Sequence, residues 1–104
     1  MIALVVRFEL APGEEAAFDV LMAETCRGIA AHEPGTLVYA VTRDPGSPAF
    51  RVFLEVYRDE AAFEDHEAQP HTRRFLERRA AHLCAPIVVD RLTVSELAVH
   101  AAEA

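Results

Sequence analysis

The chain of 104 residues is 52% hydrophobic and 26% charged, a composition that predicts one globular domain over residues 1–104. Seventeen acidic residues outnumber ten arginines, and the net charge of −7 disfavours binding to nucleic acids and to anionic membrane surfaces. Lysine is absent, which excludes a Schiff-base nucleophile and the lysine of a P-loop. No apolar run approaches the ~20 residues of a membrane span, and the N-terminus lacks the basic region of a signal peptide, so we expect a cytoplasmic protein.

Hydropathy patterns in the first half of the chain predict a strand followed by a helix. Residues 2–9 alternate, with the even-numbered positions apolar, which is the period of a strand. A helix is expected from the break at Pro12-Gly13 to about Ala31, because a single apolar stripe repeats there at helical spacing. The stripe consists of Phe18, Leu21, Met22, Thr25, Cys26 and Ile29. Glu33-Pro34-Gly35 ends this helix.

The second half of the chain predicts a hairpin, two helical segments and a last strand. Strands at 36–43 and 50–57 flank a run of turn residues at 44–48. Asp59 is expected to cap a helix that Pro70 interrupts, and a second helical segment then runs from His71 to about Leu83. A strand at 87–97 is rich in Val, Ile and Thr, and residues 99–104 are expected to form a flexible tail.

The order β-α-β-β-α-β predicts a ferredoxin-like α+β fold, in which both helices cover one face of a four-stranded antiparallel sheet. We assign the wholly apolar face of strand 50–57 to the helix side; it consists of Phe50, Val52, Leu54 and Val56. We assign the mixed face to the open side of the sheet; it consists of Arg51, Phe53, Glu55 and Tyr57. Because a half-apolar open face favours association, we expect a homodimer that pairs sheet to sheet.

Two histidines are the first candidates for catalysis. His66 and His71 flank Gln69-Pro70, where the helix break should place side chains at the edge of a cavity. Two imidazoles close together can act as base and acid at neutral pH; the alternative is that both only bond backbone groups freed by the break. We favour His71 as the base, because a helix N-terminus keeps its ring neutral. The spacing does not match His-Glu-x-x-His, so no metal site is predicted.

Glu55 and Tyr57 are polar residues of the strand at 50–57 that could also belong to a site. Glu55 is expected to pair with Arg7 or Arg51 on the dimer-facing surface. Tyr57 is either an interface residue or a phenol that lines a pocket. No glycine-rich loop follows a strand, so neither flavin nor nicotinamide is expected, and we predict no cofactor.

Residues 55–75 resemble the signature of the antibiotic biosynthesis monooxygenase (ABM) family. That signature has Glu-x-aromatic, a helix ending in His, a second His soon after, and an aromatic residue four positions further on. The matching residues are Glu55, Tyr57, His66, His71 and Phe75, and upstream Glu33-Pro34-Gly35 and Tyr39 match the family's Glu-x-Gly-x-x-x-Tyr. The resemblance implies a dimeric α+β barrel with one pocket per subunit, between the sheet and its helices.

Departures from the family pattern narrow the branches that fit. Members include cofactor-free oxygenases acting on quinols and anthrones, haem-degrading oxygenases, and an isomerase of a phosphorylated dione. The haem-degrading branch uses an Asn, a Trp and an axial His. This chain has no Asn and no Trp, and Leu76 stands where the axial His would fall, so haem degradation is set aside. Residues 59–61 and 70–71 look most like the quinol monooxygenase and dione isomerase branches.

The resemblance therefore implies a cofactor-independent monooxygenase acting on a small electron-rich aromatic or quinol substrate with O₂. His71 or His66 would be the base and Tyr57 its hydrogen-bonding partner, in a pocket lined by Tyr39, Leu54, Phe63 and Phe75. One alternative is an isomerase of a small carbonyl compound, whose phosphate would be bound by Arg73, Arg74, Arg78 or Arg79. The other alternative is a dimeric ligand-binding domain without catalytic activity.

Overall fold

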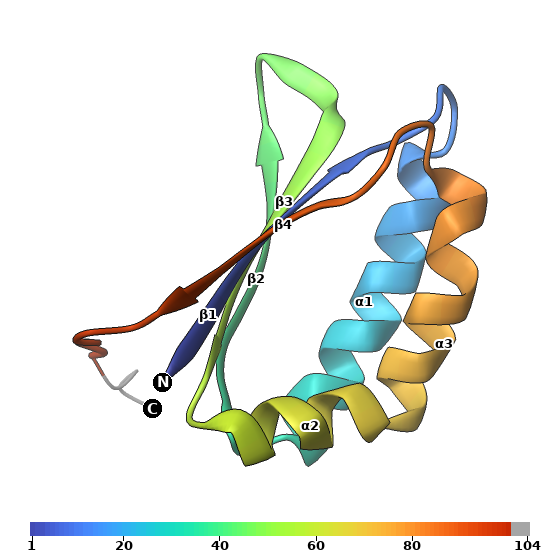
Figure 1. Ribbon diagram of the computed structural model, residues 1–104. Coiled ribbons are helices and arrows are strands. Elements are labelled where there is room, and N and C mark those ends of the chain that lie inside the picture. The colour runs from blue at the N-terminus through green and yellow to red at the C-terminus, as the bar shows by residue number, and fades with distance from the viewer. Residues whose placement is uncertain (101–104) are drawn as a thin grey trace.

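The computed structural model describes residues 1–100 and contains one antiparallel sheet covered by helices. The elements are β1 (Ile2–Glu9), α1 (Glu15–His32), β2 (Thr36–Asp44), β3 (Ser47–Tyr57), α2 (Glu60–Ala68), α3 (Pro70–Arg78), the 3₁₀ turn η1 (Arg79–His82) and β4 (Val88–Thr93). The four strands lie in the order β2-β3-β1-β4, and α1, α2 and α3 all cover the same face (Figure 1). The predicted ferredoxin-like α+β fold is confirmed. The expected tail lies outside the described residues from position 101 onward.

The second helical region divides as its sequence predicts, because local side chains define both starts. The Asp59 side chain accepts a hydrogen bond from the Ala62 amide at 2.8 Å and so caps α2. Gln69 has extended backbone angles, and Pro70 begins α3 at a position where its missing amide hydrogen is not needed. The segment expected to remain helical to Leu83 tightens to a 3₁₀ turn from Arg79.

The strands differ from the predicted ranges at the hairpin and at the C-terminal end. Strand β3 begins at Ser47 instead of residue 50, because the turn is tighter than expected. The Asp44 carboxylate accepts the Gly46 amide at 2.9 Å, which brings Asp44 and Ser47 into register as a pair. Strand β4 ends at Thr93, where its pairing with Ile2 of β1 ends, and not at residue 97.

The assignment of the two faces of β3 was wrong. Val6 of β1 is buried under the helices and pairs directly with Phe53, so the mixed face of β3 is the one that faces the helices. Its members Arg51, Phe53, Glu55 and Tyr57 are all buried. Polar side chains are tolerated there because they have partners: the Arg51 guanidinium contacts the Asp19 carboxylate of α1 at 3.1 Å. The wholly apolar face lies on the open side.

A cluster of four phenylalanines forms the centre of the core between the sheet and the helices. Ring centroids of Phe8, Phe18, Phe53 and Phe75 lie 4.6–6.1 Å apart in tilted and edge-on pairs. Such pairs contribute about 0.5–1.5 kcal/mol each beyond their area of burial. The cluster fixes the spacing of β1, β3, α1 and α3.

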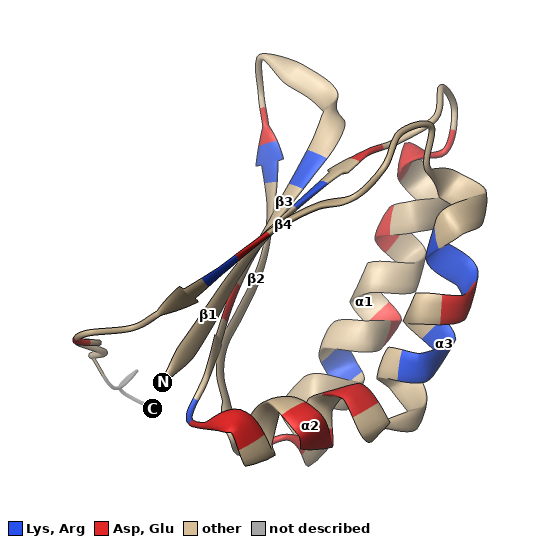
Figure 2. Cartoon of the chain, in the orientation of Figure 1, with Lys and Arg blue, Asp and Glu red and all other residues tan. Residues whose placement is uncertain are grey.

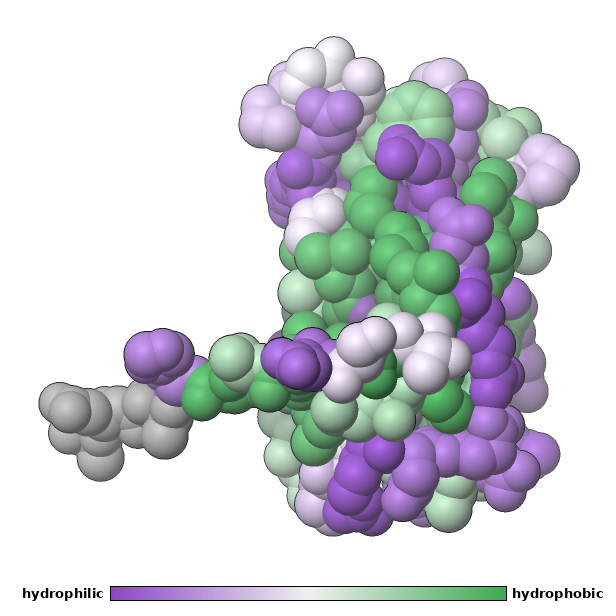
Figure 3. Space-filling model, turned by 60° about the vertical axis from the view of Figure 1, so that its left-hand side comes forward, coloured by the Kyte–Doolittle hydropathy of each residue, from purple (hydrophilic) through white to green (hydrophobic). Residues whose placement is uncertain are grey.

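The open face of the sheet is more apolar than the sequence analysis assumed. Leu54, Val88 and Leu92 are 43%, 55% and 53% exposed, and Val5 pairs with Leu54 between them. Figure 3 shows a hydrophobic area across this side of the molecule. Contiguous apolar surface of this kind marks interaction sites on small proteins. Among residues 1–100, no helix is long and apolar enough to cross a membrane.

Candidate active site

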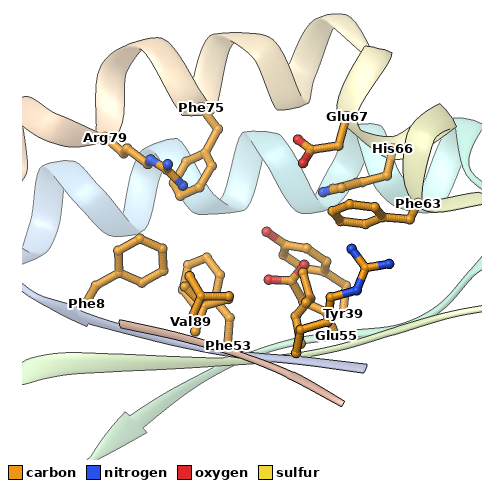
Figure 4. A pocket seen from close by; sticks show the side chains of 13 residues that line it. Phe8, Tyr39, Phe53, Glu55, Phe63, His66, Glu67, Phe75, Arg79 and Val89 are labelled. Atoms are coloured by element: carbon orange, nitrogen blue, oxygen red, sulfur yellow. The ribbon is translucent and has the colours of Figure 1, made fainter. Parts of the chain in front are cut away.

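A cavity of about 270 Å³ lies between the sheet and the helices, at the end of the aromatic core. Side chains from β1, β2, β3, β4, α2, α3 and η1 line it (Figure 4). They are Leu4, Val6, Phe8, Tyr39, Phe53, Glu55, Phe63, His66, Glu67, Phe75, Arg79, Val89 and Arg91. Aromatic walls with a few convergent polar groups are typical of small-molecule sites.

Glu55 is the acidic group in the wall of the cavity. It points from β3 toward the helices, and its side chain accepts a hydrogen bond from the Tyr57 hydroxyl. Burial raises the pKa of Glu55 to about 7, although the Tyr57 hydrogen bond opposes that shift. The carboxyl group therefore exchanges its proton near neutral pH, as a general acid–base group must.

His66 reaches the same cavity from α2 and is almost fully buried. Its Nδ1 lies 2.7 Å from Oε1 of Glu33, and its ring packs 5.6 Å from the Tyr39 ring and 5.1 Å from the Tyr57 ring. Figure 4 shows His66, Tyr39 and Glu55 together at one end of the cavity. The two titratable groups thus face one space from opposite layers.

Glu33 is a buried carboxylate that joins the two candidate histidines. It follows α1, accepts the Thr36 hydroxyl at 2.7 Å, and contacts His66 Nδ1 with one oxygen and His71 Nε2 with the other. Burial by itself would raise the pKa of Glu33, but hydrogen bonds from His71, Thr36 and His66 and the charge of His66 lower it overall. The group is therefore a carboxylate at neutral pH.

The two tyrosines near the site remain neutral phenols. Burial, with the neighbouring Glu55 charge, raises the pKa of both Tyr39 and Tyr57 well above the usual value. Tyr39 lines the cavity, where its ring and hydroxyl can contact a ligand. Tyr57 is fully buried behind Glu55 and does not line the cavity, so it positions the carboxyl group instead.

The structure brings together some of the predicted site residues and separates others. His66, Tyr39, Phe63 and Phe75 line the cavity as expected. Leu54 lies on the open face of the sheet, opposite the cavity. The prediction that it lines the pocket was wrong, because it depended on the reversed assignment of the two faces of β3. His71 contacts Glu33 and does not line the cavity.

The two histidines converge on a side chain and not on the backbone. Within the described chain their ring nitrogens bond Glu33, so the interpretation that they only satisfy freed backbone groups was wrong. Local patterns predicted that Glu33 ends a helix and indicated no role for it in the site. The feature that indicated a functional role for Glu33 was its match to the Glu-x-Gly-x-x-x-Tyr motif of the family.

The prediction that Glu55 forms an ion pair on the open face of the sheet was also wrong. Glu55 lies inside the protein, bonded to Tyr57. The available signal was again the Glu-x-aromatic element of the family signature, since periodicity alone allows either face.

Two arginines line the cavity alongside these groups. The Arg79 guanidinium lies 5.8 Å from the Phe75 ring centroid, and that of Arg91 lies 5.4 Å from the Phe63 ring centroid and pairs with Glu60. Of the four arginines considered for phosphate binding, Arg79 alone reaches the cavity. The other three, Arg73, Arg74 and Arg78, lie along α3 in solvent (Figure 2).

The fold and the cavity define a small α+β domain with a cavity between its sheet and its helices, lined by aromatic and titratable side chains. The family follows from the sequence: residues 1–78 match the antibiotic biosynthesis monooxygenase family, and the chain belongs to it. Among curated proteins, none matches this chain.

Several solved structures share the fold. A protein from Caulobacter crescentus CB15 superposes with a TM-score of 0.86 at 23% identity, covering 91% of this chain and 90% of that one. An antibiotic biosynthesis monooxygenase gives a TM-score of 0.82 at 24% identity, covering 92% and 100%. PA3566 from Pseudomonas aeruginosa gives 0.78 at 27% identity, covering 93% and 94%.

Proposed function

We propose that this protein is a monooxygenase that works without a cofactor on a small, electron-rich aromatic or quinol substrate. The observation that carries the proposal is the Glu55 carboxyl group, which changes protonation near pH 7 in the wall of an aromatic cavity that also contains His66. Family membership supports a monooxygenase-type reaction. In such a reaction the protein must supply a base, orientation and exclusion of water.

The reaction begins when a base removes a proton from an activated CH₂ group or a phenol of the substrate. The resulting anion passes one electron to O₂, and the two radicals combine into a peroxide anion on carbon. Protonation of that peroxide, removal of a second proton from the same carbon and loss of hydroxide give a carbonyl group. For a CH₂ substrate, one oxygen atom of O₂ enters the product and the other leaves as water.

The residues of this cavity divide these tasks. Glu55, ionised above pH 7, is the base for the first proton, and His66 exchanges the proton of the peroxide. The rings of Phe63 and Phe75 hold a planar substrate, and the neutral Tyr39 hydroxyl donates a hydrogen bond to its oxygen. This assignment replaces His71 by Glu55 as the base.

The functional unit we propose is a homodimer formed through the open faces of two sheets. The support is the apolar surface at Leu54, Val88 and Leu92, which a second copy would remove from water. The dimer interface would lie on the opposite side of the sheet from the cavity. Each subunit would therefore keep a complete set of acid–base residues.

Oxygen consumption tests the proposed reaction. Purified protein is mixed with anthrone or substituted 1,4-hydroquinones in an oxygen electrode, and the rate is compared with spontaneous oxidation. We expect one O₂ consumed per product and, with ¹⁸O₂ and anthrone, one labelled oxygen in the product. Glu55→Gln should lower kcat/KM by about 10²–10⁴-fold, the usual contribution of a general base, while the exposed Glu64→Gln should not. Deuterium exchange into a dione without oxygen uptake would identify an isomerase instead.

A further inference from the structure

Glu33, His66 and His71 form a hydrogen-bonded cluster next to the cavity. One buried carboxylate receives two imidazole nitrogens and one hydroxyl, from Thr36. Glu33 and His66 are only 4% and 5% exposed. Such a network can fix the orientation and protonation of each ring, because the carboxylate at its centre is buried from water.

The charge of Glu33 decides which nitrogen of His66 carries a proton. A carboxylate only accepts hydrogen bonds, so Nδ1 of His66 at 2.7 Å must be the donor when the ring is neutral. The neutral ring then has its lone pair on Nε2. Within residues 1–100, no protein group bonds Nε2, and His66 lines the cavity. The basic nitrogen is thus the one available to a substrate.

His71 holds the other side of the same carboxylate. Its Nε2 contacts Oε2 of Glu33, and its ring stacks 6.4 Å from the His32 ring at 24°. The backbone of α1 approaches it closely at Gly28, where an added Cβ would lie 2.3 Å from Cγ of His71. His71 is therefore fixed by α1 and by Glu33, and it does not line the cavity.

We propose that Glu33 is a positioning residue that holds His66 in the Nδ1–H form with Nε2 basic toward the substrate, and that His71 positions Glu33 in turn. The effect on turnover rests on the proposed function, because it assumes that His66 exchanges protons with the substrate. The protonation of the His66 ring is independent of the proposed function. His71 is thereby a supporting group for the site and never contacts the substrate.

Nuclear magnetic resonance tests the protonation of the ring without any substrate. Protein labelled with ¹⁵N in histidine is examined at pH 8 by long-range ¹H–¹⁵N correlation, and His66 is assigned by comparison with His66→Gln. We expect the pattern of a protonated Nδ1 and an unprotonated Nε2. In Glu33→Gln that preference should be lost or mixed. A wild-type His66 with its proton on Nε2 would overturn the proposal.

Steady-state kinetics tests the consequence for turnover. Partners that orient a metal-bound histidine typically contribute about 10–100-fold to activity. We expect an effect of the same order here, so Glu33→Gln should lower kcat by about 10–100-fold and change KM by less than about threefold. The matched control is Glu14→Gln, which alters the His82–Glu14 pair of 2.8 Å outside the cavity. Glu33→Gln with kcat within twofold of wild type would refute the positioning role.

Variants of His71 test the second link. His71→Gln keeps a side-chain N–H for Glu33 and should therefore retain a higher kcat than His71→Ala. Neither variant should change KM strongly. Equal and unchanged kcat in both would contradict the assignment of His71. If the wild-type protein turned over none of the substrates, the proposed function would fail, and the magnetic resonance result would still decide the protonation of His66.

Discussion

Replacing Glu55 by glutamine should make the protein more stable at high pH and leave it little changed at low pH. The amide has the same shape as the carboxyl group, and its oxygen can still accept the Tyr57 hydrogen bond. The variant differs in one property, since glutamine never bears the buried negative charge. The effect on stability therefore measures what that charge contributes to folding.

The magnitude follows from the pKa of Glu55, which burial raises from the ordinary 4.5 to about 7. At 1.36 kcal/mol per pKa unit, the ionised group destabilises the folded state by about 3 kcal/mol. Below pH 4.5 the carboxyl is protonated in folded and unfolded chains alike, and it contributes nothing. Between pH 4.5 and 7 the folded state keeps a proton that the unfolded state releases, so stability falls as pH rises. Above pH 7 the group is ionised in both states, and the full destabilisation of about 3 kcal/mol is present.

Urea denaturation followed by circular dichroism measures this difference. Wild type and Glu55→Gln are unfolded at equal protein concentration at pH 4.5 and pH 8, because every other titrating group is common to both and cancels in the comparison. We expect free energies of unfolding within about 1 kcal/mol at pH 4.5, and a variant more stable by about 2–3 kcal/mol at pH 8. A difference that does not change with pH would refute the account of Glu55 as a buried acid titrating near neutrality.

The charge of Arg79 should affect how the activity of the protein depends on pH. Its positive charge lowers the pKa of Glu55, so Arg79→Met should move the rising limb of the activity–pH profile to higher pH. Arg78→Met is the matched control, because Arg78 is exposed and does not line the cavity. A profile unchanged in Arg79→Met, or shifted equally in both variants, would show that Arg79 does not act on Glu55.

Two further outcomes concern assembly and packing. Leu54→Asp on the open sheet face should convert a dimer into a monomer of 11.5 kDa by light scattering, whereas Leu76→Asp, similarly exposed on α3, should not; a wild-type monomer at micromolar concentration would contradict the proposed interface. Gly28→Ala should lower the free energy of unfolding by at least about 1 kcal/mol, since its Cβ meets His71, although helix propensity alone predicts a gain of about 1 kcal/mol. A stabilised Gly28→Ala protein would show that His71 is free to move.

Local patterns in the sequence were enough to predict the elements and their order. Alternation over β1, the apolar stripe of α1, the turn before β3 and the cap at Asp59 each depend on residues within a few positions of one another. Their periods and turn residues leave little freedom, and the arrangement of two helices over an antiparallel sheet follows from them. The resemblance to the family signature correctly indicated the family.

The choice between the two faces of β3 was made by tertiary contacts. Alternation shows that Phe53 and Leu54 point to opposite sides, but it does not say which side is inside when both faces carry apolar residues. Asp19 of α1 neutralises Arg51, and Tyr57 bonds Glu55, so the less apolar face could be buried. The hydropathy pattern of β3 does not reveal that Asp19 will pair with Arg51 or that Tyr57 will bond Glu55.

The site itself was predicted only in part, for the same reason. Its acid–base groups lie 11 positions apart in the chain, at Glu55 and His66, and the buried carboxylate of Glu33 is 33 positions from His66 and 38 from His71. Short-range spacing singled out the two histidines and favoured His71, whereas His66 is the one that lines the cavity. Only the packing of α3 against α1 and α2 decides that His66 lines the cavity while His71, held between Gly28 and Glu33, does not.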